Sequence, residues 1–114
     1  MKRPWMPLYV ADYRIDTSHL SATQHGGYLL LIMHYWTVGR LPTDDDSLAR
    51  IACMTKKEWR RHKPVIAAFF DVNWRHKRID AEVARSEDIS HKRRLAAEQK
   101  HSKCSAIVMQ LQSK

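Results

Sequence analysis

The chain has 114 residues, 44% of them hydrophobic, which suits one domain with one core and is too apolar for a disordered chain. Its longest apolar run, residues 28–33, is far shorter than the ~20 residues needed to cross a bilayer, and acidic residues interrupt any signal-peptide segment, so we expect a cytoplasmic protein without a membrane partner. The formal net charge of +8 favours a polyanionic partner such as nucleic acid.

Residues 1–20 contain prolines and scattered aromatic residues without a helical period, which predicts an extended arm that packs on the domain. Ser21 and Gln24 then form a capping box, which predicts a first helix from about Ala22 to Thr37. That helix is apolar on almost every side, so we expect the arm, the other helices or a second subunit to cover it. A homodimer through the arm and this helix is therefore one alternative.

Two further helices are expected in close succession. A run of acidic residues favours the start of a second helix, from about Asp45 to Cys53. Thr55 and Glu58 form a second capping box, which opens a third helix, and Pro64 should kink or split that helix. Two helices joined by so short a turn are typical of a helix-turn-helix.

Residues 69–79 have the aromatic and β-branched content of a short β-hairpin that turns at Asn73. Beyond Asp80 the residues favour a helix to about Lys100. A disordered tail after His101 is an open alternative to a longer helix.

The order of these elements predicts a mainly α protein with a winged helix-turn-helix, in which three helices precede a short β-hairpin. The expected organisation is an arm over residues 1–20, a winged-helix core over residues 21–80, and a C-terminal helix and tail over residues 81–114. In this arrangement the third helix holds the recognition position.

The candidate nucleic-acid contacts are basic residues of the third helix and the expected hairpin, namely Lys56, Lys57, Arg60, Arg61, Lys63, Arg75, Lys77 and Arg78. If Trp59 marks the buried face, helical spacing turns Lys57, Arg60 and Arg61 outward. Lys56 and Lys63 lie nearer that face, so their side chains must extend outward to reach solvent. On the hairpin, Arg75 and Lys77 share one face and Arg78 lies on the other. We expect contacts to phosphate, because no residue marks a particular base; a solvated face that confers solubility is the alternative.

Other chemistry is not indicated by the residue pattern. The seven histidines include no pair at the i, i+4 spacing of a helical metal site, and helix capping accounts for the acidic residues 44–46. Cys53 and Cys104 show no paired spacing, and three glycines cannot supply a phosphate-binding loop. We therefore expect no enzyme activity, no cofactor and no metal.

Several segments resemble the YdaU-like family of uncharacterised phage and prophage proteins: Trp5–Tyr13, Asp16–Ser21, His25–Tyr28, Leu41–Asp45 and Trp74–Arg78. The resemblance covers about residues 4–95 and is most specific between Asp12 and Tyr28. It implies a winged-helix domain encoded near phage replication genes, often at the start of a longer replication-initiator-like protein, without established catalytic residues. This sequence departs from the family in a hairpin that lacks a glycine-containing insert and in the short segment after the domain, so a stunted wing and a missing C-terminal module are expected.

The sequence thus predicts a non-enzymatic phage or prophage protein that binds nucleic acid, with duplex DNA favoured, in phage DNA replication or its control. One alternative is an adaptor that binds a replication protein during helicase loading or initiator assembly. Another is a small phage effector that inhibits a host nucleic-acid-processing machine.

Overall fold

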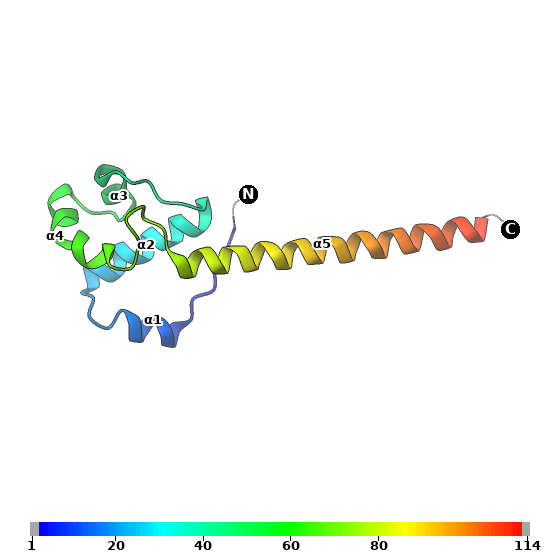
Figure 1. Ribbon diagram of the computed structural model, residues 1–114, viewed down its shortest axis with the longest axis horizontal. Coiled ribbons are helices and arrows are strands. Elements are labelled where there is room, and N and C mark those ends of the chain that lie inside the picture. The colour runs from blue at the N-terminus through cyan, green and yellow to red at the C-terminus, as the bar shows by residue number, and fades with distance from the viewer. Residues whose placement is uncertain (1–2, 113–114) are drawn as a thin grey trace. The chain divides into compact units, whose positions relative to one another are not determined.

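A computed structural model describes residues 3–112 of the chain, with side chains for residues 3–100. Within that range it contains no β-strand, which confirms a mainly α protein (Figure 1). The described chain divides into two compact units, one ending at Asp80 and the other starting at Ala81. The described helices are α1 (Val10–Asp16), α2 (Ala22–Val38), α3 (Asp45–Ile51), α4 (Lys56–Ala67) and α5 (Lys77–Gln112).

Helix α2 is the centre of the first unit, where α2, α3 and α4 each contact the other two. Its predicted capping box is present: Ser21 Oγ accepts the backbone N–H of Gln24 at 3.2 Å, and the Gln24 side chain accepts the backbone N–H of Ser21 at 2.9 Å. Gly39 ends the helix at a φ of 99°, a conformation that glycine adopts without a Cβ clash. The observed end at Val38 lies one residue beyond the predicted Thr37.

One side of α2 forms the core, and another side remains exposed. The buried side chains of the helix are Tyr28, Leu31, Ile32, Tyr35 and Trp36. Leu30 is 37% exposed and Met33 is 50% exposed, so this stripe is not covered within the described chain, and its cover by a second subunit stays a prediction. At Gly27 a Cβ atom would lie 2.5 Å from the terminal methyl group of Met54, so an alanine there would force the Met54 side chain to move.

The turn between α3 and α4 is as short as predicted. Helix α3 ends at Ile51, two residues earlier than expected, because Cys53 adopts a left-handed φ of 56°. Helix α4 begins with the predicted capping box of Thr55 and Glu58. The helix continues past Pro64 to Ala67, so the predicted split does not occur; Pro64 lies on the exposed side, where water can satisfy the carbonyl that proline leaves without a donor.

The predicted hairpin and wing are wrong, since no strand lies between α4 and α5 in the described chain. The Asp71 carboxylate accepts the backbone N–H groups of Asn73 and Arg75 at 2.8 and 2.9 Å. The backbone N–H of Asp71 donates to the Arg75 carbonyl, and Trp74 takes a left-handed φ of 58°. These local bonds hold the segment in a tight turn and replace the ladder that a hairpin would need.

The N-terminal segment contains α1 where the sequence predicts an extended arm. None of the α1 residues is buried, but Tyr13 stacks on Tyr28 of α2 with 6.2 Å between ring centroids. Asp12 and Asp16, one helical turn apart, both pair with Arg78. These partners are distant in the sequence, which is why the local pattern does not indicate this helix.

Helix α5 is longer than predicted at both ends. Residues 77–80, expected in a strand, form its first turn, and the helix continues to Gln112 instead of ending near Lys100. The predicted tail after His101 therefore begins as helix, and residues 113–114 lie outside the described part. Within that part, no helix combines the length and apolar character that a membrane span requires.

Candidate nucleic-acid interface

Helix α4 holds the cations of its outer face in a fixed register. Trp59 and Ile66 are buried at 2% and 0% exposure, and they anchor the helix on α2 and α3. Trp59 and Ile66 are seven residues apart and mark the buried side of the helix. Lys57, Arg60 and Arg61 lie away from that side and are exposed, as predicted. The N-terminal capping box fixes the first turn from which Lys57 projects.

The remaining cations of α4 are paired with acidic residues of α3. Lys63 Nζ lies 2.7 Å from Asp45 Oδ1, and Lys56 Nζ lies 3.7 Å from Asp46 Oδ1. The Lys56 side chain is 79% exposed, which agrees with the expected outward extension of this side chain. Each lysine pairs with a different acid at the start of α3, and each pair reduces the positive charge that the lysine offers to a ligand.

Asp45 joins α3 to α4 through two contacts. Besides the Lys63 ion pair, Asp45 Oδ1 accepts a hydrogen bond from Trp59 Nε1 at 3.0 Å. The Lys63 and Trp59 hydrogen bonds lower the pKa of Asp45 below its ordinary value. Asp44 accepts the backbone N–H of Ser47 and so caps α3, and Asp46 pairs with Lys56. Each acid of residues 44–46 therefore has a partner within the protein.

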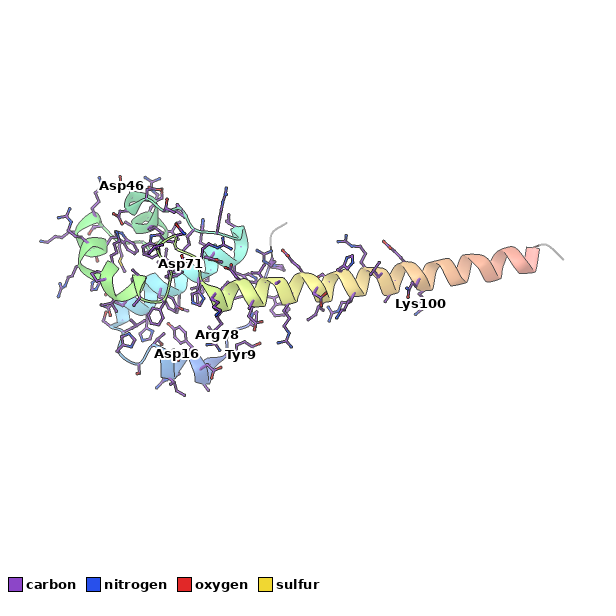
Figure 2. The ribbon with its side chains drawn as sticks, in the orientation of Figure 1. Tyr9, Asp16, Asp46, Asp71, Arg78 and Lys100 are labelled. Atoms are coloured by element: carbon purple, nitrogen blue, oxygen red, sulfur yellow. The ribbon has the colours of Figure 1, made fainter. Side chains whose placement is uncertain are left out.

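Arg75 and Arg78, expected on the hairpin, are engaged within the protein. Arg75 Nη2 lies 2.9 Å from Asp80 Oδ1, and its guanidinium lies over the Tyr35 ring. Arg78 pairs with Asp12 at 2.8 Å and with Asp16 at 3.2 Å. Figure 2 shows Arg78 at the start of α5 beside Asp16 and Tyr9, over whose ring the guanidinium lies at 5.7 Å.

Arg78 therefore clamps α1 to the start of α5, a role that the sequence pattern did not reveal. The spacing of Asp12 and Asp16, i and i+4, was the available signal, since both carboxylates face the same side of a helix. Nothing in the local sequence identifies Arg78 as their partner.

Four predicted contact residues remain without a protein partner among the side chains of residues 3–100: Lys57, Arg60, Arg61 and Lys77. The structure brings Lys57, Arg60 and Arg61 together on one helix and places Lys77 in the first turn of α5. We call the three exposed and unpaired cations of α4, namely Lys57, Arg60 and Arg61, the outer cationic face.

His76, the residue just before α5, connects α2 to the start of α5. Its Nδ1 accepts the backbone N–H of Ile79 at 3.2 Å, so in the neutral ring Nε2 carries the proton and donates to the Tyr28 hydroxyl at 2.9 Å. Burial lowers the pKa of His76, although the nearby Asp80 opposes that shift and Arg78 adds to it. Burial likewise raises the pKa of Tyr28 to about 12.

The lowered pKa of His76 predicts a loss of stability as the pH falls. As the pH falls, the unfolded chain takes up this proton near the ordinary pKa of 6.5, before the folded protein does. The stability that the neutral His76 contributes is therefore complete above pH 6.5 and is lost as the pH falls through the folded pKa. In His76→Asn, an asparagine oxygen can still cap Ile79 but cannot titrate. Urea unfolding between pH 5.5 and 7.5 should therefore show a smaller pH dependence for His76→Asn than for the wild type.

His76→Ala supplies the control for this prediction. It removes both the titrating ring and the cap, so it should share the weaker pH dependence and be less stable at every pH by about 1 kcal/mol. Equal pH dependence in the wild type and in His76→Asn would contradict the assignment.

Comparisons with known proteins agree with the resemblance in the sequence. The family described as "Protein of unknown function (DUF1376)" matches residues 4–84. The "Uncharacterized protein YdaU" of Escherichia coli (strain K12) is 45% identical to this chain over 84 residues, which cover 71% of this chain and 29% of that protein. The match therefore spans less than a third of that relative's length. No solved structure matches the chain.

Proposed function

This chain belongs to the DUF1376 family of proteins of unknown function, and we propose that it binds nucleic acid, with duplex DNA favoured, through the outer cationic face of α4. The observation that carries this proposal is the selective pairing of the cations. Acidic residues of α3 neutralise Lys56 and Lys63, whereas the outer cationic face has no acidic partner among the described side chains. An exposed group of unpaired cations attracts phosphate.

The arrangement of α3 and α4 supports a helix-turn-helix mode of binding. The two helices are joined by residues 52–55, and α4 occupies the second, recognition position. In the absence of a wing among the described residues, α4 carries the interaction, with Lys77 as an additional cation at the start of α5. The contacts are to phosphate, so affinity depends on salt and little on sequence.

The biological setting follows from the resemblance to phage and prophage proteins. We place the binding activity in phage DNA replication or its control, in the cytoplasm and without an enzymatic step. The matched relative is much longer than this chain, and the proposal concerns only the part that the two proteins share.

A protein-interaction adaptor is the second candidate, and the exposed stripe of α2 favours it. Leu30 and Met33 are three residues apart on one helical face and are 37% and 50% exposed. Such a stripe can receive an apolar surface of a replication protein or of a second copy of the chain.

Titration of the ¹⁵N-labelled protein with a short duplex DNA distinguishes the two candidates. We expect the largest amide shift changes in α4, Lys56–Ala67, with smaller changes near Leu30 and Met33 of α2. The amides of α4 should return towards their free positions as salt is added, since counterions compete for the phosphates. An absence of shift changes at any DNA concentration in low salt would contradict nucleic-acid binding.

A further inference from the structure

A pocket of about 580 Å³ opens to solvent at the C-terminal end of α4. Its apolar lining comes from Ala68, Phe69 and Phe70, and its polar lining comes from charged residues of the following turn and of the first turn of α5. This volume lies within the ~300–1,000 Å³ range of sites that bind small molecules. Of the nucleic-acid contacts proposed above, only Lys77 belongs to its lining.

The charges around the pocket balance, which argues against phosphate as the occupant. The lining contains two cations, Arg75 and Lys77, and two carboxylates, Asp71 and Asp80. Asp71 is held by backbone N–H groups, and Asp80 accepts the Tyr35 hydroxyl and pairs with Arg75. The pocket therefore favours a neutral ligand with polar edges.

The two phenylalanines of the lining pack against other aromatic rings of the core. Phe69 packs on Tyr28 with 4.6 Å between ring centroids, and Phe70 packs on Trp74 at 5.3 Å. Both phenylalanines are half-buried, so part of each ring remains accessible. A nucleobase is planar, aromatic and neutral, and it carries donors and acceptors at its edge, which matches such a lining.

The exposed side of α4 leads from the outer cationic face to this pocket. Lys57, Arg61, Pro64 and Ala68 follow one another at spacings of four, three and four residues, and all are exposed. The seven residues from Arg61 to Ala68 correspond to ~10 Å along the helix axis. At ~3.4 Å per nucleotide, a strand bound at Arg61 reaches the pocket about three nucleotides later.

We propose that this pocket takes one unpaired nucleobase of a strand whose phosphates lie on the outer cationic face. The proposal rests on the proposed function and adds a preference for nucleic acid with an unpaired base. The base stacks on the accessible ring of Phe69 or Phe70, and the charged residues at the rim contact its polar edge.

Fluorescence anisotropy with three labelled DNA probes of equal length tests the proposal. The first is a perfect duplex, the second carries one extra thymine as a bulge, and the third carries an abasic sugar-phosphate at the bulge. The wild type should bind the thymine bulge roughly fivefold to a hundredfold more tightly than the abasic bulge. Because both bulges distort the duplex, their comparison isolates the base.

Ala68→Trp fills the pocket from an exposed position, with Ala68→Ser as the matched control. Ala68→Trp should bind both bulges equally and should bind the perfect duplex within about twofold of the wild type, since the outer cationic face is unchanged. Ala68→Ser should keep the preference for thymine. Circular dichroism confirms that each variant is folded.

The outcomes separate this proposal from the one on which it rests. Equal wild-type affinity for the thymine and abasic bulges overturns the pocket proposal, whatever the variants do, and salt-dependent duplex binding then leaves the proposed function standing. A thymine preference that persists in folded Ala68→Trp also overturns it. Failure of the wild type to bind any probe overturns both.

Discussion

Replacing Lys57, Arg60 and Arg61 together by glutamine should flatten the salt dependence of duplex DNA binding. Each phosphate contact contributes ~0.9 to the slope of log K against log salt, so the slope should decrease in magnitude by about 2.7. Between 50 and 200 mM salt, the affinity loss of the variant should then be about 40-fold smaller than that of the wild type. Fluorescence anisotropy over this salt range measures both slopes.

A matched variant separates the position of the charges from their number. Arg14, Arg40 and Arg50 are exposed and lie outside α4, so replacing all three by glutamine removes the same three charges and leaves +8 − 3 = +5. If the outer cationic face binds phosphate, this control should keep most of the wild-type slope. Equal slopes for the two triple variants would instead indicate a general effect of net charge, and an unchanged slope in the α4 variant would rule out the assigned contacts.

Trp59→Ala should have the largest effect on stability. Trp59 is 2% exposed, packs on Trp74 with 5.8 Å between ring centroids, and donates its N–H to Asp45 of α3. Truncation leaves a cavity where α4 meets the core, which typically lowers the free energy of unfolding by about 3–5 kcal/mol. Urea unfolding followed by circular dichroism measures this change.

Two controls identify the origin of that loss. Trp59→Phe keeps most of the buried ring but removes the N–H donor, so it should be less destabilising than Trp59→Ala. Arg60→Gln, on the exposed side of the same helix, should change the free energy of unfolding by less than about 0.5 kcal/mol. A loss below about 1 kcal/mol in Trp59→Ala would contradict its role as the anchor of α4.

The sequence predicts the starts of α2, α3 and α4 because the signals are local. Capping boxes join residues three positions apart, as in Ser21 with Gln24 and Thr55 with Glu58, so both helix starts are correctly predicted. The exposed positions of Lys57, Arg60 and Arg61 follow from helical periodicity around Trp59 in the same way. Their contact with nucleic acid stays a prediction.

The prediction fails where side-chain hydrogen bonds to the backbone or distant residues decide the conformation. Residues 69–79 have a β-like composition, yet Asp71 holds the backbone of the turn and burial of Trp74 among the rings of Trp59 and Phe70 stabilises its left-handed conformation. Helix α1 likewise depends on Arg78, which lies 62 residues after Asp16 and 66 after Asp12. Local propensity cannot report contacts across such separations.

The sequence by itself determined the helical class, the starts of α2, α3 and α4, and the cationic outer side of α4, because each depends on residues within one or two turns of one another. The tertiary structure alone decided which cations remain available. Aspartates, mostly from other elements, pair with four of the eight candidate cations, namely Lys56, Lys63, Arg75 and Arg78. The other four remain unpaired among the described side chains. Electrostatic pairing depends on distance in space, and only the fold sets that distance.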